Sequence, residues 1–169
     1  MITTATIDDI PELAELINSG YRGKASRKGW TTEADLIDGE LRTDEADLKE
    51  LLIKAGSMFL KFTVDGKILG CVYLQKQAGK MYLGMLTVSP AAQASGIGKE
   101  ILSASEKFAR QEGCDSIIMN VISIRHELIE WYERRGYMQT GKTNPFPTET
   151  KFGTPRLPIE FMVLEKKLV

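Results

Sequence analysis

The first third of the chain has apolar residues at three- and four-residue intervals, the period of an α-helix that packs on one side. The first such run predicts a helix that begins at Asp8 or Asp9 and carries Pro11 in its first turn. Gly20 is expected to end this helix. Its inward-facing positions are Ile10, Leu13, Leu16 and Ile17.

The period of the apolar positions then changes. Two more helices are expected over residues 32–41 and 44–55, and an antiparallel meander is expected over 57–88. The strands of this meander are predicted at 58–64, 67–75 and 81–88. Asp65-Gly66 is a strong hairpin signal because both positions tolerate a positive φ.

The second half alternates helices with strands. The expected elements are a helix over 99–112, a strand over 116–122, a helix over 125–135 and strands over 137–142 and 160–166, with a short edge strand over 1–5. The run from 81 to 122 is a strand–helix–strand crossover, so its two strands should be parallel neighbours. The pattern therefore predicts a single α/β (α+β) domain over 1–169, with a mixed, mostly antiparallel, twisted sheet and helices on both faces.

The composition is that of a soluble globule, with 43% hydrophobic and 27% charged residues in a chain of 169. Lys and Arg total 22 against 23 for Asp and Glu, and a net charge of −1 provides no overall field to attract nucleic acid or a membrane surface. Cys71 and Cys114 are expected to be reduced core residues of a cytoplasmic protein. The chain is expected to be a monomer or a homodimer.

A glycine-containing loop follows the strand that ends at Val88. Its sequence, Gln-Ala-Ser-Gly-Ile-Gly at 93–98, leads directly into a helix, so backbone N–H groups and the positive end of a helix dipole converge there. Such a loop can hold a pyrophosphate, although a tight turn that binds nothing has the same pattern. A nucleoside-triphosphate loop is disfavoured because Gly98-Lys99 is followed by Glu100, and a dinucleotide fingerprint would need a third glycine.

Two segments together resemble the GCN5-related N-acetyltransferase (GNAT) family. Gln-x-x-Gly-x-Gly after a strand ending in Val-x-Pro resembles its motif A, and Trp-Tyr-Glu-Arg-Arg-Gly-Tyr at 131–137 resembles its motif B. One helix and one strand separate them, as in the family, and the order of elements extends the resemblance over 1–169. The resemblance implies the GNAT fold and an acyltransferase that uses acetyl-CoA to acetylate an amine.

The resemblance also implies where coenzyme A lies. Its pyrophosphate would rest on the loop at 93–99, and its pantetheine arm would pair like an extra strand with residues 86–88. The acetyl group would enter a splay between the strands that end at Val88 and Ile122. The implied cofactor-binding residues are Leu86, Thr87, Val88, Gln93, Ala94, Ser95, Gly96, Ile97, Gly98, Lys99, Asn120 and Val121.

Tyr132 matches the tyrosine that protonates the departing thiolate in many members of the family; the alternative is a core aromatic residue. Reference pKa values of ~10 for tyrosine and ~8.5 for a thiol make this proton transfer uphill by about 2 kcal/mol. The strand at 82–87 lacks the carboxylate that many relatives use as a base. Glu33, Asp35, Glu127 or a water chain could serve instead. No metal is expected, because no His, Cys or carboxylate pair has ligand spacing.

The acceptor site is implied to lie between the first helices and a proline-bearing loop at 144–158. Its predicted residues are Tyr21, Arg22, Trp30 and Glu33. The segment 21–30 also carries Lys24, Arg27 and Lys28, which suggests a small primary amine with an anionic group nearby. Direct attack in a ternary complex is expected. A non-catalytic acyl-CoA sensor and a protein or peptide N-acetyltransferase remain the alternatives.

Overall fold

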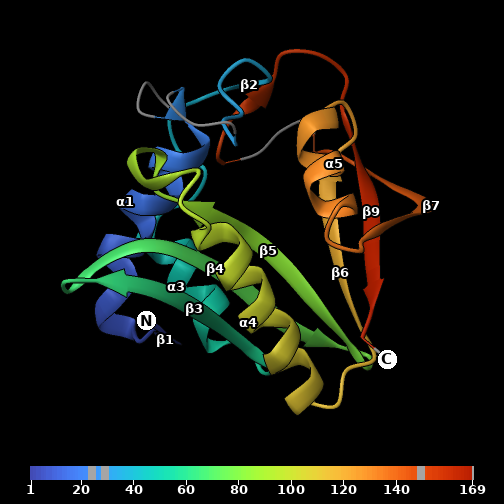
Figure 1. The fold of residues 1–169 in the computed structure, drawn as a ribbon. Helices are drawn as coiled ribbons and strands as arrows, with labels where there is room; N and C mark the ends of the chain where they lie inside the picture. Colours follow the sequence, from blue (N-terminus) through green and yellow to red (C-terminus); the bar gives the residue numbers. More distant parts are fainter. Residues whose placement is uncertain (23–25, 28–30, 148–150, 169) are drawn as a thin grey trace.

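A computed structural model describes residues 1–22, 26–27, 31–147 and 151–168. Within these ranges, seven strands form one sheet in the order β1-β3-β4-β5-β6-β9-β7 (Figure 1). These strands are β1 (Ile2–Thr4), β3 (Ser57–Val64), β4 (Lys67–Gln77), β5 (Lys80–Val88), β6 (Ser116–Ile122), β9 (Glu160–Lys167) and β7 (Met138–Pro145). The helices are α1 (Ile10–Tyr21), α3 (Glu45–Ile53), α4 (Ile97–Gln111) and α5 (His126–Glu133). None of these helices has the length and apolarity to cross a membrane.

Alternate residues of the sheet enter two separate cores, one on each face. On β4, Val72 and Leu74 belong to the core that contains α4 and α5, whereas Cys71 and Tyr73 belong to the core of α1 and α3. Figure 1 shows α4 crossing one face while α1 and α3 lie behind the other. The mixed, mostly antiparallel sheet with helices on both faces is therefore confirmed.

The crossover through α4 makes β5 and β6 parallel, as predicted, but the two strands pair only at their beginnings. Their paired residues are Lys80 with Ser116, Met81 with Ile117 and Tyr82 with Ile118. β5 then continues to Val88 and β6 to Ile122 with no further pairing between these fully described strands, and the two ribbons diverge in Figure 1. One edge of each strand therefore faces the gap with its backbone N–H and C=O groups.

The helix predicted over 32–41 is wrong. Thr32 accepts a hydrogen bond from the backbone N–H of Ala34, and the turn that follows gives way to the two-residue strand β2 (Ile37–Asp38). This strand pairs antiparallel with β8 (Thr154–Pro155). The partner strand lies more than a hundred residues away in sequence, so no local pattern could reveal the pairing.

Gly20 does not end the first helix, which continues to Tyr21. A Cβ atom at position 20 would lie 2.6 Å from Cγ2 of Thr87, so only glycine allows α1 to approach β5 this closely. The close approach places Tyr21 beside the gap between β5 and β6. The hairpin turn at Asp65-Gly66 is confirmed, with φ of 51° and 77°.

Candidate active site

Two cavities meet where β5 and β6 diverge. The first, of about 320 Å³, lies beside the beginning of α4, and the second, of about 140 Å³, lies between β5 and β6. Four residues line both cavities: Tyr21, Leu86, Leu128 and Tyr132. The two cavities are therefore adjacent and meet at these four side chains.

The first cavity is built around the glycine loop, as the sequence predicts. Residues Gln93 to Lys99 all line it, together with Leu86 and Val88. Gly96 caps α4 with φ of 84°, and the first helical hydrogen bond runs from the N–H of Glu100 to the Gly96 carbonyl. The preceding N–H groups of the first turn have no carbonyl acceptor within the helix, which makes this end a fitting site for a pyrophosphate.

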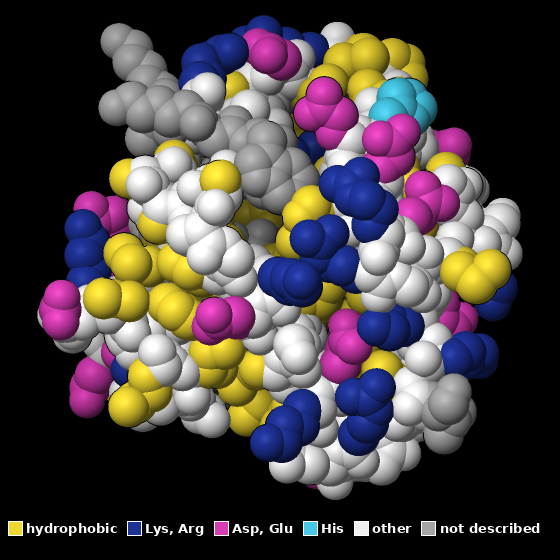
Figure 2. Space-filling model, viewed as in Figure 1, with side chains coloured by type: hydrophobic (Ala, Val, Ile, Leu, Met, Phe, Trp, Pro, Cys, Tyr) yellow, Lys and Arg dark blue, Asp and Glu magenta, His cyan; other side chains and the backbone are white. Residues whose placement is uncertain are grey.

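Cationic side chains add to this site. Lys99 and Arg135 line the first cavity, and Figure 2 shows Lys and Arg side chains gathered beside a hollow between α4 and α5. The guanidinium of Arg135 lies 3.8 Å from the centroid of the Trp131 ring and donates to the Trp131 carbonyl at 2.8 Å. Its buried Nε has no hydrogen-bond partner among the described residues. Trp131 and Arg135 were not predicted as site residues; Trp131 lies in α5 and Arg135 in the turn that follows it.

A β-bulge lies in β5 at the junction of the two cavities. Gly84 pairs with Tyr73 and Thr87 with Cys71, so β5 has one residue more than β4 over this interval. The Tyr21 hydroxyl donates to the Leu86 carbonyl at 2.5 Å, which fixes the bulged backbone. Thr87 does not line either cavity, and its hydroxyl donates to the Met85 carbonyl, so only its backbone could contact a cofactor.

The second cavity contains charged groups in a largely buried setting. Glu33 is 7% exposed and accepts a hydrogen bond from Nε of Arg22 at 3.1 Å, while a guanidinium nitrogen of Arg125 lies 4.0 Å from its other oxygen. Glu33, Arg125 and Arg42 line the cavity, and Arg22 lies behind Glu33. Asn120 and Val121, predicted to contact the cofactor, line this second cavity rather than the first, on the β6 side of the gap.

Arg22 does not reach the cavity, contrary to the predicted contact with an acceptor. It is 4% exposed, and its guanidinium donates to Glu33 and to the carbonyls of Leu41 and Phe152. A guanidinium with three protein acceptors holds the surrounding segments together and leaves little donor capacity for a ligand. Trp30, together with Lys24 and Lys28, lies outside the described residues.

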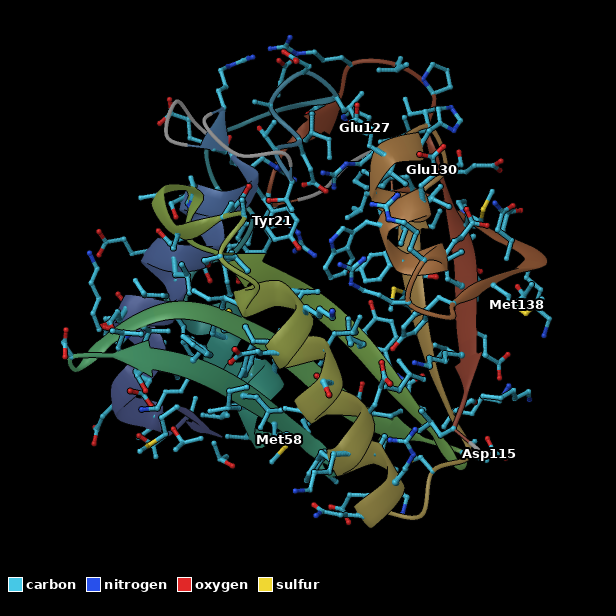
Figure 3. All side chains as sticks on the ribbon, in the orientation of Figure 1. Tyr21, Met58, Asp115, Glu127, Glu130 and Met138 are labelled. Atoms are coloured by element: carbon cyan, nitrogen blue, oxygen red, sulfur yellow. The ribbon has the colours of Figure 1, made fainter. Side chains whose placement is uncertain are left out.

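The other candidate bases lie on the surface. Asp35 is exposed and pairs with Arg27 at 2.8 Å, and Glu127 is exposed on α5 (Figure 3). Neither residue lines a cavity. Of the three candidate carboxylates, Glu33 lines the second cavity. Among the described residues, no group of His, Cys, Asp and Glu could hold a metal.

Burial controls the ionisation of the two tyrosines at the junction. Burial raises the pKa of Tyr132, the nearby Tyr21 raises it further, and Arg125 opposes both effects. Burial also raises the pKa of Tyr21 to about 12, with Arg42 acting in the opposite direction. Both hydroxyls therefore keep their protons at neutral pH and can act as hydrogen-bond donors. Figure 3 shows Tyr21 in the space between α1 and α5.

Known structures share this fold. The ribosomal-protein-S18-alanine N-acetyltransferase of Escherichia coli superposes with a TM-score of 0.72 at 14% identity, covering 99% of this chain and 93% of that one. The PaiA N-acetyltransferase of Thermoplasma acidophilum, solved in complex with coenzyme A, superposes with a TM-score of 0.69 at 17% identity, covering 99% of this chain and 98% of that one. Identities this low establish the fold alone.

Sequence comparison identifies curated relatives and the family. Human N-acetyltransferase 8B is 26% identical over 125 residues, which are 70% of this chain and 54% of the relative. The chain thus spans about half the length of the curated relatives it matches. The model of the Acetyltransferase (GNAT) family, whose members use acetyl-CoA, matches residues 12–137, well over half of the chain. This protein therefore belongs to the GNAT family of acetyltransferases.

Proposed function

We propose that this protein transfers the acetyl group of acetyl-CoA to a primary amine of a small molecule, by direct attack in a ternary complex. The main support for this proposal is the position of Tyr132, which lines both cavities at the point where β5 and β6 separate. A thioester held at this point would face the cofactor loop on one side and an acceptor on the other. The N-acetyltransferase names of the curated relatives support an amine as the acceptor.

Tyr132 is proposed as the general acid. Bound acetyl-CoA supplies an activated thioester whose C–S bond breaks as the C–N bond forms, leaving a thiolate that needs a proton. Burial makes Tyr132 a weaker acid, but the same burial destabilises a bare thiolate and raises its proton affinity as well. Because burial shifts both partners in the same direction, the two shifts offset one another in the cost of the proton transfer.

Glu33 is proposed to attract the acceptor amine. It is the acidic residue lining the second cavity, and its carboxylate is fixed by Arg22 and Arg125. An ammonium group would enter beside this negative charge and would pass a proton to Glu33 or to a water chain before attack. Neither Asp35 nor Glu127 lines the cavity, which leaves Glu33 and water as the candidates for the base.

The size of the second cavity supports a small acceptor. About 140 Å³ accommodates a group of the size of one amino acid. Modification of a protein N-terminus is the alternative that the Escherichia coli neighbour suggests by fold alone. A cytoplasmic location is proposed because both cysteines are free and buried, as in proteins of a reducing compartment.

The test is an acetyl-transfer assay with acetyl-CoA and a panel of small amines and peptides, in parallel with calorimetry of acetyl-CoA binding. The expected result is release of one CoA thiol per acetylated small amine, with kinetics that require both substrates to be bound. Binding of acetyl-CoA without transfer to any amine would indicate a sensor. Transfer confined to peptides would indicate a protein N-acetyltransferase, and either result would overturn the proposal.

A further inference from the structure

The second cavity has an excess of positive charge. Its charged lining residues are Glu33, Arg42 and Arg125, and the buried Arg22 lies directly behind Glu33. One carboxylate thus faces three guanidinium groups. Glu33 is already engaged by Arg22 at 3.1 Å and by Arg125 at 4.0 Å. Arg22 and Arg125 thus share a single carboxylate, and Arg42 is the lining cation that forms no ion pair with Glu33.

The guanidinium of Arg42 has no acidic partner among the described residues. Its guanidinium lies 5.8 Å from the centroid of the Tyr21 ring, and no carboxylate of the described residues forms an ion pair with it. The side chain is half-buried at the edge of the cavity. A guanidinium held against an aromatic face keeps its N–H edge available, which suits bidentate binding of a carboxylate.

The backbone that carries Arg42 is fixed to α1. Oδ1 of Asn18 accepts hydrogen bonds from the backbone N–H groups of Arg42 at 2.6 Å and of Thr43 at 3.0 Å. Nδ2 of the same Asn18 donates to the Thr43 carbonyl at 3.1 Å. The position of Arg42 is therefore set by the helix that also carries Tyr21.

Tyr21 connects this cation to the reaction point. Its ring supports Arg42 on one side, and its hydroxyl donates to the Leu86 carbonyl in the β5 bulge. An anionic group bound at Arg42 would thus lie within one tyrosine side chain of the place where the two cavities meet. Glu33, which lines the same cavity, offers the opposite charge to an ammonium group.

We infer that the acceptor carries a carboxylate beside its primary amine, as an α-amino acid does, and that Arg42 is the residue that selects it. This inference rests on the proposed function. It differs from the expectation drawn from the cationic segment 21–30, because Arg22 is occupied by protein groups and Arg27 forms an exposed pair with Asp35. The selecting cation comes from a different segment of the chain.

The experiment compares matched acceptors that differ only in the carboxylate: phenylalanine with phenethylamine, tryptophan with tryptamine, and alanine with ethylamine. The wild type is expected to favour the carboxylated member in kcat/KM by about 10- to 100-fold, the range of a charge-assisted hydrogen bond. Arg42→Ala should abolish this preference by raising KM for the amino acid only, with an unchanged Kd for acetyl-CoA. Arg42→Lys should restore part of the preference.

Arg27→Ala is the matched control, since it removes an exposed arginine that lines neither cavity. It should retain the full preference. Equal wild-type rates for each pair, with amines acetylated, would overturn the inference and leave the proposed function standing. Transfer to no amine despite bound acetyl-CoA would overturn both. An Arg42→Ala variant that loses both members of each pair equally would assign Arg42 a structural role and would also overturn the inference.

Discussion

The two ends of the β5–β6 pair differ in what occupies the space between the strands. At the closed end, Met81 faces Ile117 in the ladder and both side chains are fully buried. At the open end, Leu86 and Val121 still belong to the core but also line cavities. The same two strands thus form closed core at one end and cavity walls at the other. The fold combines a stable sheet with an accessible interior because the two strands stop pairing part of the way along their length.

The charges at the two ends differ in the same sense. At the closed end, Glu165 pairs with Lys80 at 3.0 Å and with Lys167 at 3.3 Å, so both cations there have an acidic partner. At the open end, Arg22 and Arg125 share Glu33, and Arg42 lines the second cavity without an ion pair to any carboxylate of the described residues. Substitutions at the closed end should therefore alter stability, and substitutions at the open end should alter binding or rate.

The largest effect is expected for Tyr132→Phe at the open end. The substitution keeps the ring that packs against Trp131 and Tyr137 and removes only the proton donor. We expect kcat to fall by about 100- to 10,000-fold, the usual contribution of general acid catalysis. The Kd for acetyl-CoA by calorimetry should change little. An unchanged kcat, with chemistry shown to limit the rate, would reduce Tyr132 to a packing residue.

Gly96→Val should come next, with an effect on cofactor binding. Gly96 has φ of 84°, and a β-branched residue there would displace the N–H groups at the beginning of α4. We expect the Kd for acetyl-CoA to rise by about tenfold or more, because several charge-directed hydrogen bonds would be misplaced.

Gly141→Val provides the matched control for Gly96→Val. Gly141 has φ of 83°, its surroundings are equally open, and it lies in β7, away from both cavities. The backbone cost of the two substitutions should be similar, so thermal unfolding should shift comparably. Equal weakening of acetyl-CoA binding in both variants would show that the loop has no special role in holding the pyrophosphate.

At the closed end, Glu165→Gln should lower the stability of the fold in a pH-dependent way. Burial raises the pKa of Glu165, but the ammonium groups of Lys80 and Lys167 and the nearby Ser116 hydroxyl outweigh it and lower the pKa to about 2. The folded pKa is thus below an unfolded value of about 4.3, so the carboxylate stabilises the fold above pH ~4.3 and loses this effect as the pH falls towards 2. We expect the variant to lose about 1–2 kcal/mol at pH 6, since the lysines are partly solvated.

This loss is measured as the difference in unfolding free energy from wild type in urea between pH 6 and pH 2.5. The difference should shrink steadily with acid, and acetyl transfer at pH 7 should persist. Glu130→Gln, at an exposed position on α5, should show no such trend. A difference that is constant with pH would exclude the ion pairs as its source.

The smallest effect is expected when Cys71 and Cys114 are both changed to Ala. Both thiols are buried, neither lines a cavity, and burial raises the pKa of Cys71 to about 12, so it is a poor nucleophile. Turnover should stay within a few-fold of wild type, because direct transfer needs no acyl-cysteine. An acetyl thioester detected on either residue by mass spectrometry would contradict the ternary-complex mechanism.

Local sequence patterns predicted the structure correctly where an element depends on residues close to it in sequence. The glycine loop at 93–98, the helix that follows it and the Asp65-Gly66 hairpin depend on turn chemistry and apolar period, and the structure confirms them. The prediction of a helix over 32–41 was wrong because residues of that segment pair with β8 as a short strand. The end of α1 was misplaced because Gly20 serves a contact with Thr87 rather than a helix stop.

The sequence by itself determined the strands of the main sheet, the parallel crossover and the position of the glycine loop, because these follow from backbone propensities over short spans. Only the tertiary structure decided which charges meet in the second cavity. It assigned Arg22 to the interior, placed Glu33 between Arg22 and Arg125, and left Arg42 facing the cavity from a segment that carries no motif. The physical reason is that a charge acquires its role from partners within a few ångströms, and those partners come from distant parts of the chain.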